Sequence, residues 1–290
     1  MMRSNAHHMG MRTKTKISNT IIYIVLVIMM LIWLIPFVCI LLESFRIEST
    51  GKVGYVIPKV WGFDNYISLW TKTDFPTWYL NTLIIGLVVA VVQMAFVLCT
   101  SYTLSRMRFK GRKGLMNFIL VLGMFPGFIT MIVLYKVLSG VGLTNENAIF
   151  GLMLVFTASS GMGYYVSKGF FDTIPKSLDE AARVDGATRL QVLTKVTLPM
   201  SKPIVIYTIL TAFMAPWGDF MFARYISHLT SKGMTVAVGL QSWLNTELMT
   251  NAYYTRFCAG GVMVAIPITL LFMFLQKYYV EGVTGGAVKG

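Results

Sequence analysis

Six long apolar runs, separated by short polar stretches, divide the 290-residue chain. Crossing a bilayer core of about 30 Å takes about 20 apolar residues of α-helix, and each run has roughly that length. Backbone groups in lipid must bond within their own segment or in a closed barrel, and the two-residue alternation of barrel strands is missing here. The pattern therefore predicts an all-α integral membrane protein with six transmembrane helices. The runs cover approximately residues 21–42, 81–105, 115–138, 148–170, 204–225 and 257–280.

Composition and charge agree with this prediction and give it an orientation. Hydrophobic residues make up 56% of the chain and charged residues 13%, which is outside the usual balance of a soluble domain. With the amino terminus inside, 17 of the 25 Lys and Arg residues fall on the inner face, many of them in short loops. The positive-inside rule then places both termini in the cytoplasm. The basic residues are dispersed helix flanks, so we expect membrane lipid around the chain and no nucleic acid as partner.

The side chains needed for common enzyme chemistry are missing from the sequence. The three cysteines are widely spaced single residues, which excludes a metal site of the CxxC type. A membrane serine hydrolase needs a base, yet outside the first ten residues the only histidine is His228, in a predicted external loop, and no GxSxG is present. The Gly-Lys pair at residues 51–52 lacks the other positions of a phosphate loop. We expect no catalytic residues, metal or cofactor in this chain.

A compact charged segment, residues 175–200, lies between the fourth and fifth apolar runs. Ser177 and Glu180 have the spacing of a capping box, which predicts a short helix from Ser177 to Asp185. Gly186 then follows as a C′ residue that accepts positive φ at little cost.

A second short helix is predicted directly after that glycine. Thr188 and Gln191 form another possible capping box. We expect Leu198 and Pro199 to end this helix near Val196, because proline lacks a donor and disfavours helical geometry before it. The result is two short helices set at an angle on the cytoplasmic face.

Two interpretations of this segment remain open from its residues. In the first it is a docking element for a soluble partner, since Ala181 and Ala182 permit close approach and Glu180 offers one carboxylate. In the second it is an amphipathic elbow that lies on the membrane, with Glu180 only capping its helix.

A resemblance to a known family favours the first interpretation. The segment resembles the EAA loop of permease subunits of bacterial ABC importers, and the stretches WGDF (217–220), TVAVGLQSWL (235–244) and FLQKYYVEGVTGGAVKG (274–290) are similar to carbohydrate permeases of the maltose/maltodextrin type. The similarity extends from about residue 17 to the end. The EAA positions are filled here by Glu180, Ala181, Ala182, Gly186, Val196, Leu198 and Pro199.

The resemblance implies a type I importer permease fold with a cytoplasmic coupling helix, in the bacterial inner membrane. The expected partners are a second permease subunit, two ATPase subunits and an extracellular or periplasmic sugar-binding protein; ATP and Mg are bound by the ATPases. The family also implies that the carboxyl-terminal tail reaches toward the ATPase interface, through Glu281, Gly285, Gly286 and Lys289.

The expected organisation follows from these segments. Residues 1–16 form a cytoplasmic tail, of which 1–10 resemble an added extension ahead of the native start. Residues 17–76 contain the first helix and an external loop, residues 77–280 the permease domain, and residues 281–290 the cytoplasmic tail.

Polar residues at depth are candidates for the substrate pathway, because they are costly in lipid. Asp219 is placed near the outer surface, where pairing with Arg224 is an alternative to sugar contact. The external segment 226–254, with Trp243 and Asn245, is either a contact for the binding protein or a cap over helix ends. The pathway candidates are Gln93, Thr211, Trp217 and Asp219.

Two other classes of protein remain as alternatives. A self-sufficient secondary transporter or channel would show internal repeats and ion-binding charges in its helices, and neither is evident. A non-transporting scaffold would only recruit a soluble partner through the EAA-like segment.

Overall fold

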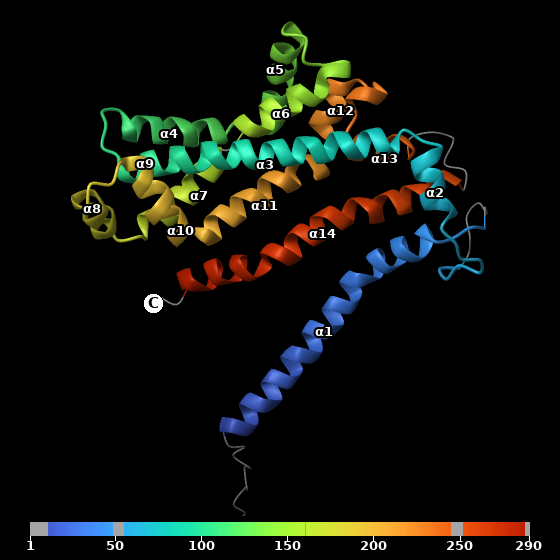
Figure 1. Ribbon diagram of the computed structural model, residues 1–290. Coiled ribbons are helices and arrows are strands. Elements are labelled where there is room, and N and C mark those ends of the chain that lie inside the picture. The colour runs from blue at the N-terminus through green and yellow to red at the C-terminus, as the bar shows by residue number, and fades with distance from the viewer. Residues whose placement is uncertain (1–10, 49–54, 160, 245–251, 288–290) are drawn as a thin grey trace, which may run out of the picture.

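The computed structural model describes residues 11–48, 55–159, 161–244 and 252–287, and within these ranges the protein is almost entirely helical (Figure 1). Three helices exceed 30 residues: α1 (Met11–Ser44), α3 (Phe75–Arg106) and α14 (Ala252–Ala287). Helices of intermediate length, from 11 to 17 residues, are α4 (Arg112–Gly123), α5 (Gly127–Gly140), α6 (Ala148–Ala158), α7 (Gly161–Asp172) and α11 (Lys202–Gly218). Short elements are α2 (Asp64–Thr71), η1 (Asn145–Asn147), α12 (Met221–Ser227), η3 (Ser231–Gly233) and α13 (Val236–Ser242).

The prediction of six membrane crossings agrees with these helices. Within the described residues, four apolar spans are long enough to cross a bilayer, and two bent helix pairs bring the possible number to six. The single spans are Ser18–Ser44, Phe75–Arg106, Asn145–Asp172 and Tyr253–Lys277. The pairs are Arg112–Gly123 with Gly127–Gly140, and Arg189–Met200 with Lys202–Gly218.

The third and fifth runs differ from straight helices. The third bends by 98° between Gly123 and Gly127, because Pro126 precedes α5 with extended ψ of 123° and has no N–H to continue the ladder. A Cβ at Gly123 or Gly127 would meet nothing within 4 Å, so neither glycine is needed for close helix packing within this chain. The fifth helix ends at Gly218 rather than near Tyr225, which lies in α12.

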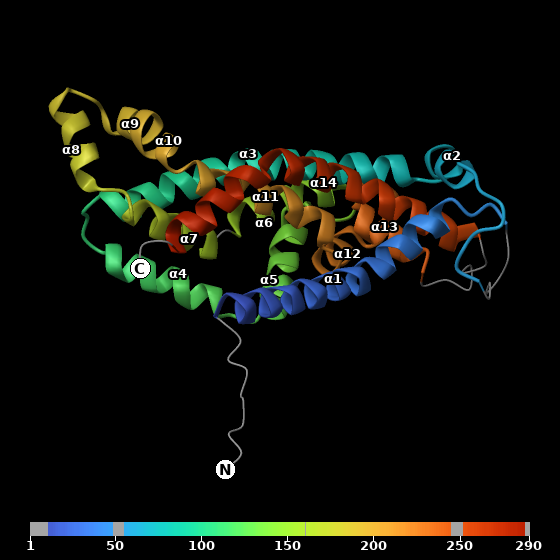
Figure 2. The same ribbon diagram turned by 90° about the horizontal axis from the view of Figure 1, so that it is seen from below.

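Helix α3 lies at the centre of the bundle, against α11, α7 and α6 (Figures 1 and 2). The α3–α11 approach is close because Gly86 has no side chain: a Cβ there would lie 3.2 Å from the carbonyl oxygen of Phe213. A large apolar cluster at the end of α3 near α13 includes the buried side chains of Trp78, Ile85 and Phe213. A smaller cluster lies at the opposite end of α3.

Helix α1 diverges from this bundle (Figure 1). It packs against α14, but the apolar side chains along residues 21–38 are exposed, as Trp33 is at 72%. Such a surface is stable only against lipid or another apolar helix.

The segment after α1 is held by a charged cluster. Arg46 is 2% exposed and its guanidinium donates to the carbonyl oxygens of Tyr55 and Val56, both at 3.0 Å. The carboxylate of Glu48 accepts hydrogen bonds from Lys59 N at 2.6 Å and Val60 N at 2.8 Å. These bonds join the chain just after α1 to residues 55–60, which lie just ahead of α2.

Candidate functional site at the helical elbow

The charged segment forms a bent helical elbow at the end of the bundle where α3 finishes (Figure 1). It consists of α8 (Lys176–Val184), α9 (Arg189–Val192), the π-helical turn η2 (Leu193–Thr197) and α10 (Leu198–Met200). The stretch Arg189–Met200 meets α11 at 87°. The two predicted short helices are α8 and α9, and they lie at an angle to each other (Figure 2).

Gly186 ends α8 as predicted, with φ of +84°. Gly186 N donates to Arg183 O at 3.1 Å, and Ala187 N donates to Ala182 O at 3.0 Å. These two bonds make a Schellman motif, which requires the left-handed conformation at its glycine. The backbone hydrogen bonds of this motif therefore set the direction in which the chain leaves α8.

The two predicted capping boxes have different outcomes. Thr188 N donates to Gln191 Oε1 at 2.7 Å and Gln191 N donates to Thr188 Oγ1 at 3.3 Å, which confirms the second box. The first box, Ser177 with Glu180, is wrong. The helix begins one residue earlier, at Lys176 after Pro175, so Ser177 lies inside the first turn and makes no capping bond.

The predicted helix stop at Leu198 and Pro199 is also wrong, because helical structure continues to Met200 and breaks at Ser201. The π-helical turn before Leu198 accounts for this. In a π-helical turn each N–H bonds to the carbonyl oxygen five residues earlier, one residue further back than in an α-helix. The changed hydrogen-bond pattern makes room for the ring of Pro199, which has no N–H donor.

The elbow rests on the smaller apolar cluster. Val192 and Leu193 are 1% and 6% exposed and pack with side chains of α3, α7 and α11. The core of this cluster is formed by Leu98, Tyr102, Phe171, Ile174, Val192, Leu193 and Ile204. Since buried contacts join the elbow to three membrane helices, it moves with them as one packed unit.

The EAA-like residues lie mostly on the outer surface of this elbow. Glu180, Ala181, Gly186 and Pro199 are exposed, while Ala182 and Leu198 are half-buried against the smaller cluster. Among the described residues, Glu180 has no ion-pair partner within 4.0 Å and does not cap α8. Its carboxylate is therefore not used to hold the helix start, as the membrane-elbow interpretation required.

Arg106 and Asp179 hold α8 against α3, and neither was singled out from the sequence. Arg106 is the last residue of α3, and its Nε lies 2.9 Å from Asp179 Oδ2 with both side chains nearly buried. Its Nη2 donates to Ile174 O at 2.9 Å. On the sequence, Arg106 is one basic helix flank among many, so nothing there marks it as a buried partner.

A second polar contact joins α3 to α7 at the residue just before Arg106. Ser105 Oγ donates to Asp172 Oδ1 at 2.6 Å, and Lys168 pairs with the same carboxylate. The ends of α3, α7 and α8 are thus tied together by charged or hydrogen-bonded groups.

The carboxyl-terminal candidates lie at the end of the last helix. Helix α14 includes Glu281, Gly285 and Gly286 and runs to Ala287, so their backbone is helical. Lys289 lies outside the described residues.

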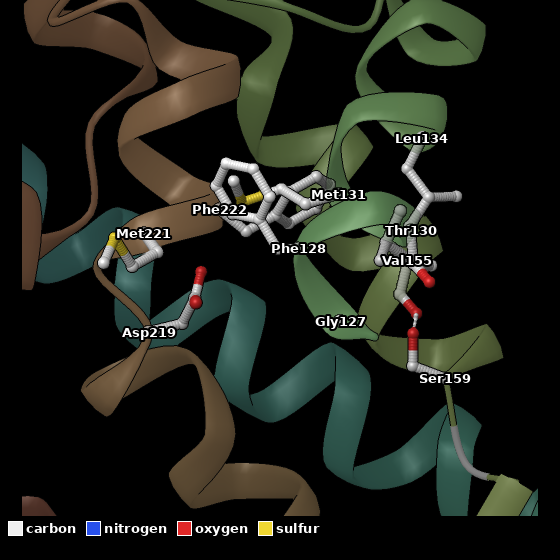
Figure 3. A pocket seen from close by; sticks show the side chains of 10 residues that line it. All are labelled: Gly127, Phe128, Thr130, Met131, Leu134, Val155, Ser159, Asp219, Met221 and Phe222. Carbon is white, nitrogen blue, oxygen red and sulfur yellow. Dashed lines mark hydrogen bonds between the residues drawn. The ribbon is translucent and has the colours of Figure 1, made fainter. Parts of the chain in front are cut away.

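The four pathway candidates do not converge on one cavity. Gln93 is half-buried on α3, Thr211 is exposed on α11 and donates to Tyr207 O at 2.9 Å, and Trp217 is 4% exposed and packs on Tyr79 and Phe213. Of the four, Asp219 lines a largely apolar cavity of about 480 Å³ together with Thr130 and Ser159 (Figure 3).

Asp219 lies at the edge of this cavity, where its carboxylate is hydrogen-bonded to the first turn of α12. It follows α11 in extended conformation, and its Oδ2 accepts a hydrogen bond from Ala223 N at 2.9 Å. The expected pairing with Arg224 is wrong: among the described residues no ion pair joins them. The carboxylate stabilises the first turn of α12 instead.

The external segment is partly a cap over helix ends. The ring of Trp243 lies 5.5 Å from that of Trp78 and 5.9 Å from that of Tyr253. Asn245 lies outside the described residues.

The fold and the elbow define a multi-pass membrane protein of the transport class. The chain belongs to the family described as binding-protein-dependent transport system inner membrane component, which matches residues 97–285. It is similar to the maltodextrin transport system permease protein MdxG of Bacillus subtilis, with 32% identity over 97% of this chain and 100% of that protein. It is also similar to the galactooligosaccharides transport system permease protein GanQ of the same species, with 33% identity over 92% and 94%.

A solved structure shares the fold over nearly the whole length. It is the crystal structure of a bacterial ABC transporter involved in the import of the acidic polysaccharide alginate, with a TM-score of 0.77 and 25% identity. The alignment covers 96% of this chain and 99% of that chain. The type I importer permease fold implied by the sequence is confirmed.

Proposed function

We propose that the chain is the permease subunit of an ATP-driven oligosaccharide importer, and that it provides half of the translocation pathway. Relatives of maltodextrin and galactooligosaccharide systems support an oligosaccharide as the transported class. The resemblance seen in the sequence favours a maltodextrin-like sugar within that class.

The observation that carries this proposal is an exposed Glu180 on a rigidly packed elbow. The carboxylate has no ion pair within the described part of the chain, and the neighbouring Val184 is 87% exposed. We assign coupling to ATPase closure to this surface, because a stiff element joined to pivoting helices transmits rigid-body motion. The coupling set is Glu180, Ala181, Ala182, Gly186, Leu198 and Pro199.

The partners are a second permease subunit, two ATPase subunits that bind ATP and Mg, and an external sugar-binding protein. The exposed apolar surface of α1 supports an apolar partner in the membrane, either lipid or the second permease. The protein itself provides a path and no catalytic group.

Orientation follows from the basic residues around the elbow. Six crossings place the amino terminus, the elbow and the end of α14 on the same side, which the positive-inside rule makes cytoplasmic in the bacterial inner membrane. The tail residues Glu281, Gly285, Gly286 and Lys289 then belong to the side of the membrane that we assign to the ATPases. On the opposite side, we assign Asp219 and its cavity to the outer half of the pathway, and Gln93 and Thr211 to its wall. Trp217 lies in the packed core.

The proposal is tested by reconstituting the chain in vesicles with its second permease, ATPases and binding protein. Glu180→Lys is expected to reduce binding of the ATPase subunits at least about tenfold, because a charge reversal at a docking contact adds repulsion to the lost attraction. Sugar-stimulated ATP hydrolysis falls with it. Glu146→Lys is the matched control, since Glu146 is an equally exposed carboxylate in η1, away from the elbow.

Three outcomes discriminate the alternatives. Equal ATPase binding and hydrolysis in both variants contradicts the coupling assignment. Sugar uptake by the chain without ATPases supports a self-sufficient transporter. ATPase recruitment without any uptake in the complete assembly supports a scaffold.

A further inference from the structure

A polar cavity of about 450 Å³ lies between the end of α3 and the elbow. Its walls come from the end of α3 and, far along the chain from it, from helix α8 and the start of α9. The lining residues are Tyr102, Arg106, Met107, Arg108, Lys176, Asp179, Glu180, Arg183 and Arg189.

The cavity carries an excess of positive charge. Five of its lining residues are Arg or Lys and two are acidic. Within the described part of the chain, Arg106 with Asp179 is the one ion pair among these seven side chains. Four cations therefore face one remaining carboxylate, Glu180, without a direct partner. This local excess of positive charge favours the binding of an anion.

Buried atoms in the same place lack hydrogen-bond partners. The side chain of Arg106 is 6% exposed, and its Nη1 is buried without an acceptor. A guanidinium carries five N–H donors and no acceptor, and leaving one unsatisfied in the interior costs free energy. An acceptor is therefore missing at Arg106, and the four other cations favour an anionic one, while Asp179 Oδ1 of the same pair lacks a donor.

The position of the cavity limits the source of that anion. Arg106 ends a helix of 32 residues, so the cavity lies where a membrane span reaches the aqueous boundary. Arg side chains match the oxygens of a phosphoryl group with two parallel hydrogen bonds. Basic pockets between membrane helices at this depth suit phospholipid head groups.

We propose that this cavity binds a phosphate-bearing anion, supplied either by a phospholipid head group or by soluble phosphate. The bound phosphoryl group bridges Arg106 of α3 to Arg183 of α8 and Arg189 of α9. It thereby fixes the elbow relative to α3 through charges that the chain alone leaves unbalanced. The inference does not depend on the transport proposal, since it concerns the isolated chain.

The test uses the full chain in nanodiscs of phosphatidylcholine with and without phosphatidylglycerol. Native mass spectrometry measures the phosphatidylglycerol that stays bound. The double variant Arg183→Gln and Arg189→Gln is chosen because both side chains are exposed and α8 and α9 do not depend on them for packing. The control is Lys195→Gln with Lys202→Gln, which removes two exposed charges from the same end of the bundle but from outside the cavity.

Relative to the control, the double variant is expected to retain at least about tenfold less phosphatidylglycerol, since the loss of one hydrogen bond between charged groups weakens binding about tenfold or more. In a second arm, inorganic phosphate is titrated into the detergent-purified chain. Loss of phosphate binding in the double variant, with phospholipid retention unchanged, supports the site with a soluble ligand. Equal binding of both probes by the double variant and the control overturns the proposal. The proposal is also overturned if the double variant keeps both probes and loses only ATPase binding, because the cavity is then a contact surface for the ATPase subunits.

Discussion

Arg106 Nε and Asp179 Oδ2 lie 2.9 Å apart across the junction between α3 and α8, with 6% and 12% of the two side chains exposed. This pair joins a membrane-spanning helix to the elbow whose outer face carries Glu180. Because α3 packs at the centre of the bundle, the pair connects α8 to the core helices. The charge pair and the apolar cluster around Val192 and Leu193 act together in this connection.

Removing either member of that pair is expected to destabilise the protein strongly. Arg106→Gln or Asp179→Asn leaves the other charge buried without its partner, and breaking a buried ion pair in this way costs about 3–5 kcal/mol. The double variant is expected to cost less than the sum of the single variants. Thermal unfolding in detergent micelles measures all three. Strictly additive losses, or single variants with an unchanged midpoint, would contradict the role given to the pair.

Thr188→Ala is expected to lower stability by about 1 kcal/mol, because it removes the capping bond to Gln191 N. Ser177→Ala is the matched control. Ser177 makes no capping bond in α8, and its replacement is expected to change stability by less than about 0.5 kcal/mol. Chemical denaturation of the two variants side by side provides the measurement, and equal losses would show that the first capping box exists after all.

Gly186→Ala is expected to cost about 1–2 kcal/mol, because an L-residue with a Cβ is strained in the left-handed region. A Cβ there meets no atom within 4 Å, so the loss is conformational and not a clash. Gly169→Ala in α7 is the control. A Cβ there is equally free of contacts, and a helix-interior glycine replaced by alanine gains up to about 1 kcal/mol. A destabilised Gly169→Ala with an unaffected Gly186→Ala would refute this account of the turn.

Acid is expected to loosen the segment after α1 through Glu48. Loss of hydration raises the pKa of Glu48, but hydrogen bonds from Lys59 N, Val60 N and Tyr55 outweigh it and hold the pKa below its ordinary value. A lowered pKa in the folded protein means that the stabilisation is present above the ordinary pKa of glutamate and is lost as pH falls through the lowered value.

The measurement is the unfolding midpoint as a function of pH for wild type, Glu48→Gln and the control Glu146→Gln. Glu48→Gln is expected to flatten the acid limb of the curve. Glu146→Gln, whose carboxylate lies on the surface 3.7 Å from Lys232 Nζ, is expected to keep it. The same acid limb in all three proteins would mean that Glu48 is not responsible.

Local signals in the sequence were sufficient for features that depend on neighbouring residues. Gly186 and the Thr188–Gln191 box form as predicted, because a Schellman turn and a capping box are completed by residues within a few positions of each other. The Ser177 box failed because Pro175 starts the helix one residue earlier. Pro175 and Ser177 are both possible N-cap residues of α8, and the sequence pattern alone does not show which of them the helix uses.

Contacts between residues that are distant along the chain could not be predicted from the sequence. The partners of Arg106, the burial of Trp217 and the bond from Ala223 to Asp219 depend on where separate helices meet. Trp217 was a pathway candidate because an aromatic ring suits both a sugar and a protein core. Its contacts with Tyr79 and Phe213 place it in the core.

The order of apolar runs by itself determined that this protein is a helical membrane protein, because lipid forces each crossing to satisfy its own backbone. The local sequence also determined the elbow and its glycine turn, because both depend on residues that lie close together along the chain. Only the tertiary structure decided which charges meet beneath the elbow and that Glu180 stays on its surface. Those outcomes depend on the packing of α3 against α7, α8 and α11, and packing joins residues that no local pattern connects.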